Sequence, residues 1–229
     1  MSDYPTGPPP YAPTPAARVY AAAQGRHHSD YLFGFWSALG WTILTLGIFG
    51  YYVVYQLFRR LRDHNRRRIE LLDAALSLAW EEAGRRQLQA ELESNFQRAT
   101  VHLNRLRALT TEFREPGIWV ILYVVGGGIT QIIAFILLDQ DLVHHDQAEG
   151  GVEHELAAIY GRLGYALPAP DPGRVKAPDR YVARVIVSVV TFGIYTLWWW
   201  RDQLVGPNVH FSTNWAQEDA LVHAAQAIG

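Results

Sequence analysis

The chain has 229 residues, of which 49% are apolar and 18% are charged, and its formal net charge is −2. The charged share lies below the roughly 25% of an ordinary soluble domain. Because the chain has no cysteine, a disulfide framework, a cysteine-ligated zinc site and a thiol nucleophile are excluded. The 20 basic and 22 acidic residues nearly balance, so the overall charge gives no case for nucleic acid as a partner.

The beginning of the chain is rich in proline, with the string PTGPPPYAPTP. Such a composition favours extended polyproline conformations and cannot form a packed core. We therefore predict a disordered, proline-rich tail over residues 1–26.

Three long stretches contain no Asp, Glu, Lys, Arg or His. A helix needs about 20 apolar residues to cross the core of a bilayer. The second stretch has this length and can cross directly, the first exceeds it, and the third reaches it only if Arg184 extends to the headgroups. The sequence thus predicts an all-α membrane protein with three hydrophobic helical segments, at residues 27–58, 116–138 and 181–201.

A run of arginines follows the first hydrophobic segment. Such a run is typical of a cytoplasmic loop, and its side chains can bind anionic lipid headgroups. We therefore predict that these side chains lie at the cytoplasmic membrane surface. They are Arg59, Arg60, Arg62, Arg66, Arg67 and Arg68.

Apolar residues recur every three or four positions across residues 59–115, which indicates two amphipathic helices. Both ends of this segment attach to the same membrane face, so the helices must form a hairpin. We predict a cytoplasmic helical hairpin that turns near Gly84, with Pro116 breaking the returning helix. The apolar stripes are expected to pack the two arms together; a partner-binding or oligomerising face is the alternative.

Residues 139–180 begin as an acidic, histidine-rich helical segment and end as a proline-rich linker. Asp141, His145, Glu149 and Glu153 are spaced by four, which places them on one helical face, and imidazole and carboxylate groups are ordinary ligands of zinc, manganese or iron. Two glycines after Glu149 are expected to interrupt this helix, however, so a solvated helix end is the commoner explanation, and we predict no metal site. A metal site or proton relay, if present, would draw on His144, His145, Asp146, Glu149 and His154.

The chain resembles itself at an offset of 146 residues, which we interpret as an internal duplication. The aligned pairs include Thr45 with Thr191, Gly47 with Gly193, Ile48 with Ile194, and His64 with His210. The strings TLGIFGYYVVY and TFGIYTLWWW resemble the T-x-G-I-[FY]-x-x-[YW] signature of a family of small bacterial membrane proteins, a domain of unknown function that often occurs in tandem. The resemblance implies a multi-pass protein of the bacterial inner membrane and supplies no activity or catalytic residue.

Two topologies stay open for the hydrophobic segments. Glycine permits backbone angles that other residues avoid, and a threonine hydroxyl can bond back to its helix and bend it, so a kink is expected at each signature. In one topology all three segments cross, with the N-terminus outside; in the other, the first and third are re-entrant from the cytoplasmic side. Residues 202–229 are predicted to form a C-terminal amphipathic helix.

The apolar stretches contain no ionisable group, whereas pumps and proton-coupled transporters bury such groups at membrane depth. We therefore predict a non-catalytic integral membrane protein, not an enzyme and without a cofactor, that organises lipids or partner proteins at the cytoplasmic face. Its expected partners are the lipid bilayer and either a protein partner or further copies of itself. The alternative is a small oligomeric channel or carrier with a His/acidic gate.

Overall fold

The computed structural model describes residues 13–111, 114–168 and 180–229. This part of the chain is all-helical and contains no strand, which confirms the predicted all-α class. The helices are α1 (Pro15–Gln24), α2 (Arg26–Ser29), α3 (Phe35–Leu44), α4 (Ile48–Arg85), α5 (Gln89–Thr111), α6 (Pro116–Arg162), α7 (Tyr181–Val190) and α8 (Ile194–Ile228).

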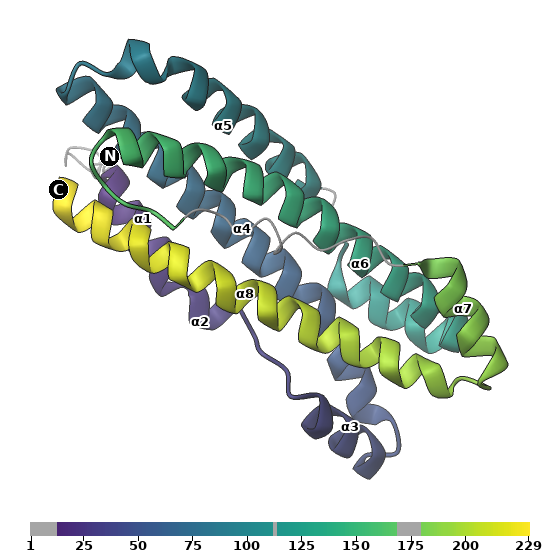
Figure 1. Ribbon diagram of the computed structural model, residues 1–229. Coiled ribbons are helices and arrows are strands. Elements are labelled where there is room, and N and C mark those ends of the chain that lie inside the picture. Colours follow the sequence, from purple (N-terminus) through teal and green to yellow (C-terminus); the bar gives the residue numbers. More distant parts are fainter. Residues whose placement is uncertain (1–12, 112–113, 169–179) are drawn as a thin grey trace, which may run out of the picture.

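Three long helices, α4, α6 and α8, form the body of the molecule (Figure 1). α5 follows α4 after residues 86–88, next to Gly84, and packs against both α4 and α6. Its apolar stripe, which includes Phe96 and Leu103, therefore contributes to a core shared by several helices rather than by two arms alone.

Part of the predicted tail is folded, which corrects that expectation. Residues 15–24 form α1, whose first turn is capped by the hydroxyl of Thr14, 3.2 Å from the amide nitrogen of Ala17. Proline at the first helical position has the backbone angle that a helix start requires. α1 contacts α4 and α8 and buries Val19 completely, so apolar packing holds it in place. Residues 1–12 lie outside the described residues, as does the predicted linker over 169–179.

The first and third hydrophobic segments each fold as two helical arms that meet at a sharp turn. α3 meets α4 at Gly47 (φ +95°), and α7 meets α8 at Gly193 (φ +87°), both in the left-handed region that favours glycine. The hydroxyl of Thr45 accepts a hydrogen bond from the amide of Phe49, 2.9 Å away, and thereby satisfies a free donor at the start of α4. Thr191 makes the equivalent bond at the start of α8. The signature thus specifies a turn.

Among the described helices, α6 alone is long and apolar enough to cross a membrane by length and composition, with a mean hydropathy of 2.3 over 18 residues. It is not straight, however, which corrects the predicted direct crossing by residues 116–138. The backbone leaves the helical region at Gly127 (φ +53°, ψ −131°), where glycine alone avoids a steric penalty. The chain reverses direction there. Arg114 consequently lies 3.1 Å from Asp141, so the two halves of this segment lie side by side and antiparallel.

The same helix continues where we expected an interruption. Gly150 and Gly151 are helical, and α6 ends only at Arg162. A side chain at Gly151 would place its Cβ atom 2.5 Å from a ring nitrogen of His102 on α5. The glycine therefore permits α5 to approach closely, and the helix brings Glu149 and Glu153 into the protein interior.

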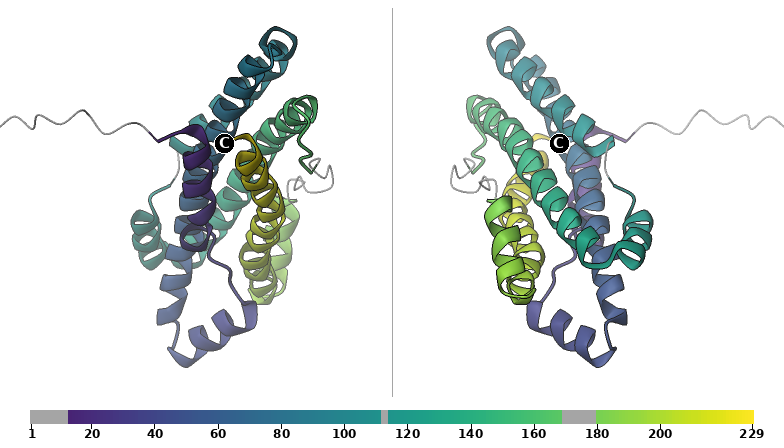
Figure 2. Two further views of the ribbon diagram at one scale, coloured as in Figure 1. Left: turned by 90° about the vertical axis from the view of Figure 1, so that its left-hand side faces the viewer. Right: turned by 90° about the vertical axis from the view of Figure 1, so that its right-hand side faces the viewer.

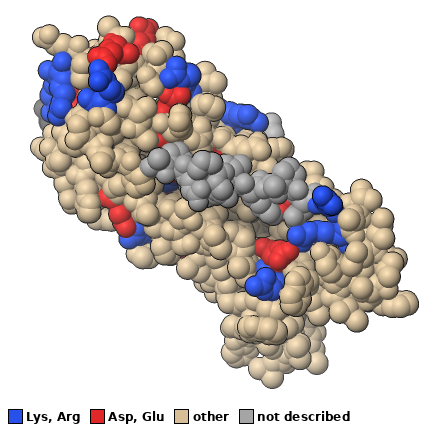
Figure 3. Space-filling model, in the orientation of Figure 1, with Lys and Arg blue, Asp and Glu red and all other residues tan. Residues whose placement is uncertain are grey.

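Two apolar cores divide the bundle along its length. Core 1, which includes Leu72 and Val152, is formed by α1, α4, α5, α6 and α8. Core 2, which includes Leu57 and Leu138, lies toward α3 and α7. Figure 2 shows α3 and the beginning of α4 diverging from the bundle at the core 2 end. On the face shown in Figure 3, charged side chains gather away from the turns of that end.

Candidate metal centre

Three histidine rings meet between the two cores, one from each long helix. His64 belongs to α4, His145 to α6 and His210 to α8. Their ring centroids are 5.6 Å apart for His64 and His145, 5.2 Å for His64 and His210, and 5.3 Å for His145 and His210. All three are buried, with at most 6% of each residue exposed, so the helices place the imidazoles in a site closed to bulk water.

Glu149 of α6 completes a set of four potential metal ligands. One ligand atom from each of the three histidines and this glutamate lies within 4.8 Å of the others. The Oε2 atom of Glu149 is 3.4 Å from Nε2 of His145 and 3.3 Å from Nε2 of His210. Zinc bound at about 2.0–2.1 Å in a tetrahedron separates its ligand atoms by about 3.3–3.4 Å. These two separations have the size that a tetrahedral site requires.

Two aspartates orient two of the rings. Oδ1 of Asp30 lies 2.8 Å from Nδ1 of His64, and Oδ1 of Asp146 lies 3.2 Å from Nδ1 of His210. Because an ionised carboxylate only accepts hydrogen bonds, Nδ1 of His64 carries the proton and its Nε2 presents a lone pair. Nε2 of His64 is buried and has no hydrogen-bond partner among the described residues. Metal-bound histidines are held by carboxylates in this same way.

The surroundings favour the neutral form of His64 and His145 and the ionised form of Glu149. Burial lowers the pKa of His64 to about 3, although Asp30 opposes the shift. Burial likewise lowers the pKa of His145. Burial alone would raise the pKa of Glu149, but the Arg68 guanidinium, followed by His145, holds it well below its usual value. His64, His145 and Glu149 thus rest in the protonation states that bind metal ions.

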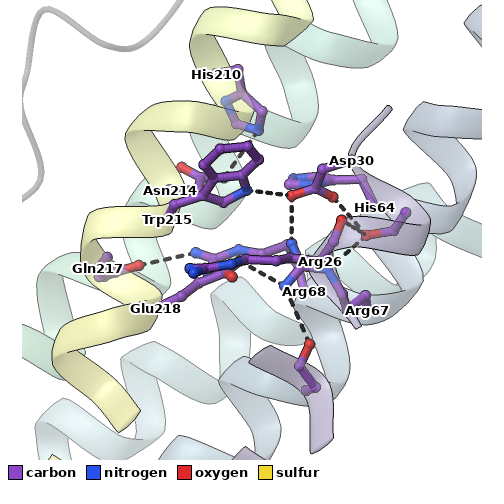
Figure 4. A network of polar contacts seen from close by, with 12 residues as sticks. Arg26, Asp30, His64, Arg67, Arg68, His210, Asn214, Trp215, Gln217 and Glu218 are labelled. Carbon is purple, nitrogen blue, oxygen red and sulfur yellow. Dashed lines mark hydrogen bonds and ion pairs between the residues drawn. The ribbon is translucent and has the colours of Figure 1, made fainter. Parts of the chain in front are cut away.

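Two arginines of α4 support the site on the side of core 1. Arg68 donates to Glu153 (2.7 Å) and forms an ion pair with Glu149. Figure 4 shows Arg67 and Arg68 between Asp30 and the α8 side chains Gln217 and Glu218. Arg67 lies 2.8 Å from each of Asp30 and Glu218. The arginines therefore fix the ligand Glu149 and the orienting group Asp30 together.

The five residues that the sequence offered as metal or proton-relay candidates lie in different environments in the structure. His145 and Glu149 belong to the cluster, and Asp146 orients His210 from beside it. His144 and His154 are exposed and face away. A helix that continues through the glycine pair explains the outcome, because it keeps one face of α6 buried and the other in solvent.

The six arginines of residues 59–68 also differ in their burial. Arg59 and Arg66 are exposed and Arg62 is partly buried. Three of the six are buried, which corrects the expectation that all six lie at the membrane surface. They are Arg60, Arg67 and Arg68, and they point inward because this part of α4 packs against other helices.

Sequence reasoning did not select His64 and His210 as ligands, although the offset of 146 residues aligned them. The distance in sequence between certain glycines and these histidines could have identified them. The chain contains four Gly-Ile pairs, and in three of them, beginning at Gly47, Gly128 and Gly193, a histidine follows the glycine by seventeen residues; the pair that begins at Gly117 has none there. These histidines are His64, His145 and His210. Equal helical lengths from equivalent turns bring them to one level.

No family model, curated protein or solved structure matches this chain.

Proposed function

We propose that this protein is a membrane-associated metalloprotein that binds one divalent transition-metal ion, with zinc the best fit, through His64, His145, His210 and Glu149. One observation carries the proposal: a buried imidazole from each long helix converges with a buried carboxylate, so that one ligand atom of each group lies within 4.8 Å of the others. Three nitrogens and one oxygen suit zinc, for which imidazole and carboxylate are regular ligands.

The centre is structural. Catalytic zinc sites use three protein ligands and leave a fourth position for water, whereas structural sites close the tetrahedron with four. Here four buried side chains close it. They come from α4, α6 and α8, so the metal fastens three helices that lie far apart in sequence. A non-catalytic role for the chain stays our prediction.

The test measures zinc content and thermal unfolding of purified protein in detergent. We expect about one zinc per chain, and a rise in the unfolding temperature on adding zinc to chelator-treated protein. At a free zinc concentration 100 times Kd, binding adds about 2.7 kcal/mol to the free energy of unfolding. Cobalt should replace zinc and give the intense visible absorption of tetrahedral cobalt.

Adjacent histidines provide a matched pair of variants. His145→Gln should abolish the stoichiometric zinc and the zinc-dependent stabilisation, while His144→Gln, which alters the exposed neighbour, should leave both unchanged. Equal zinc content in the two variants, or a wild-type protein that holds no zinc and is not stabilised by it, would contradict the proposal.

The predicted organisation of lipids or protein partners at the cytoplasmic face is compatible with this centre, because a fastened bundle is a rigid support. The channel or carrier with a His/acidic gate stays the alternative. Ion flux through reconstituted liposomes that His145→Gln abolishes, together with absent zinc, would favour that alternative.

A further inference from the structure

The three apolar stretches share one construction: two short helical arms joined at a glycine with positive φ. Hairpin 1 consists of α3 and the beginning of α4, and turns at Gly47. Hairpin 2 consists of the two arms of α6 on either side of Gly127. Hairpin 3 consists of α7 and the beginning of α8, and turns at Gly193.

An arginine joins the two arms at the open end of each hairpin. A straight helix would hold residues 114 and 141 about 40 Å apart, so these contacts exist only because the chain doubles back. The contacts are Arg60 with the carbonyl oxygen of Tyr31 (3.3 Å), Arg114 with Asp141 (3.1 Å) and Arg184 with Asp202 (2.9 Å).

The closed ends, by contrast, are apolar and uncovered. At the three turns Leu46, Val125 and Phe192 are 95%, 82% and 96% exposed. Exposed apolar side chains such as Ile43 and Val189 continue along the arms. Apolar surface of this extent marks an interaction site, and the arginine contacts that join the arms lie at the opposite end of each hairpin.

All three hairpins point the same way. α4, the second arm of α6, and α8 each begin at a turn and reach the three clustered histidines seventeen residues after a Gly-Ile glycine, about 26 Å along the helix. Because the three histidines meet at one level, the three turns lie at a similar depth beyond it. Hairpins 2 and 3 also adjoin: a cavity of about 620 Å³ is lined by Ile129 and Ile132 of one and by Phe192 and Leu197 of the other.

The first arms of hairpins 1 and 3 are too short to cross a bilayer. α3 and α7 have 10 residues each, which gives about 15 Å of helix, against a hydrocarbon core of about 30 Å. This length matches one leaflet. Exposed aromatic side chains on the arms, such as Trp36 and Trp198, have the amphipathic character found at membrane interfaces.

We infer that the protein is monotopic: its three hairpins enter a single leaflet of a lipid bilayer from the same side, and none of its segments crosses. The occupant of the apolar surface is lipid. The apolar surfaces of the three hairpins are uncharged and lie at a similar depth, and each hairpin has an arginine at its open end. Half of a bilayer has the same sequence of environments, from the apolar core to the charged headgroups. This inference is independent of the metal proposal.

Single cysteines test it directly, because the chain has none. One exposed residue on each side of every hairpin is replaced in turn, and a membrane-impermeant maleimide is applied to bacterial spheroplasts and to inside-out vesicles. We expect all six positions to react from the cytoplasmic side alone. The variants are His28→Cys with Arg66→Cys, Glu115→Cys with Gln147→Cys, and Arg180→Cys with Ser212→Cys.

A second set of variants probes the turns in vesicles of phosphatidylethanolamine and phosphatidylglycerol that contain no other protein. Leu46→Cys, Val125→Cys and Phe192→Cys should resist the maleimide until detergent is added. Val101→Cys, at an exposed apolar position on α5, should react at once and serves as the matched control.

Each alternative gives a distinct and contradicting result. A segment that crosses once would place its two flanking cysteines on opposite sides, and a hairpin whose two arms both cross would let its turn cysteine react from the side opposite to its flanks. Turns covered by protein instead of lipid would react in the protein-free vesicles. Only same-sided flanks together with protected turns agree with insertion into one leaflet.

Discussion

His64 is a histidine that the fold keeps neutral. It is fully buried, and burial lowers its pKa to about 3, well below the unfolded value of about 6.5. Below pH 6.5 the unfolded chain therefore binds a proton that the folded chain does not, and the free energy of unfolding falls as the pH falls. His145, whose pKa is also lowered, adds to the effect.

We predict that metal-free protein loses stability between pH 6.5 and pH 5, by up to about 1.4 kcal/mol per pH unit for each such histidine. Asp30 and Glu149 have lowered pKa values, so their contribution disappears only below the pH at which they titrate when unfolded, about 4. Thermal unfolding of chelator-treated protein measures the slope.

The variant His64→Gln should reduce this slope, while His154→Gln, at an exposed position, should leave it unchanged. A stability that is constant or rises on acidification from pH 6.5 to pH 5 would show that these imidazoles are not held neutral.

At the residue scale the sequence predicted no metal site, but two of the residues named as candidates, His145 and Glu149, belong to the cluster. The spacing of His145 and Glu149 indicated one helical face, and helix geometry makes that face buried once α5 and α8 cover it. The partners His64 and His210 lie 81 and 65 residues from His145, and no local pattern states that three helices will meet. Equal spacings after Gly-Ile become informative only when the turns are known to be equivalent.

Within α8, a proline leaves one backbone carbonyl oxygen without its helical hydrogen-bond donor, and a side chain of α4 donates to that oxygen instead. Pro207 has no N–H, so the carbonyl oxygen of Gln203 loses its donor four residues on. Arg60 of α4 donates to this oxygen at 2.6 Å and to that of Leu204 at 3.1 Å. A side chain that the sequence placed among lipid headgroups therefore completes the hydrogen bonding of a neighbouring helix.

We predict that Arg60→Leu lowers the free energy of unfolding by about 2–4 kcal/mol, because an unsatisfied buried polar group costs about 1–3 kcal/mol. Arg59→Leu, at the exposed neighbour, should cost less than about 1 kcal/mol. In a Pro207→Ala background, the new N–H can bond to Gln203, so the cost of losing Arg60 should fall by about 1 kcal/mol.

Denaturation of the four combinations as a double-mutant cycle measures this coupling. Additive effects of the two substitutions would show that the arginine does not compensate for the proline.

At the element scale, hydropathy identified the apolar stretches but not their course. A straight helix and a pair of antiparallel helical arms both satisfy their backbone hydrogen bonds within the segment, so composition alone does not distinguish them. The turn depends on Thr45 and Gly47 acting together, and on one glycine among three at residues 126–128. The contact of Arg114 with Asp141, which only the folded chain reveals, decides the course of α6.

Across the whole molecule, the centre lies at the junction of core 1 and core 2, and its ligands come from the three helices that pass through both. An ion held there stabilises contacts on either side. Stability gained by binding the native state alone appears in every amide that exchanges through global unfolding.

We predict that saturating zinc slows hydrogen exchange in both cores to a similar extent, by about 100-fold at 100 times Kd. The amides of Leu72 and Val152 report on core 1, and those of Leu57 and Leu138 report on core 2. Exchange of wild-type protein and of His145→Gln, with and without zinc, measures the effect. Slowing confined to one core would show that the halves unfold separately.

The turns between the arms carry no charge, and this has a consequence for biogenesis. Moving a charged residue to the centre of a membrane costs about 2.5–3.5 kcal/mol on insertion scales, yet Thr45–Gly47 and Thr191–Gly193 lead their hairpins without one. A finished chain released from the ribosome can therefore dock tip-first. In the topology that we infer, the described residues contain no polar loop that must cross the membrane, so their insertion requires no protein-conducting channel.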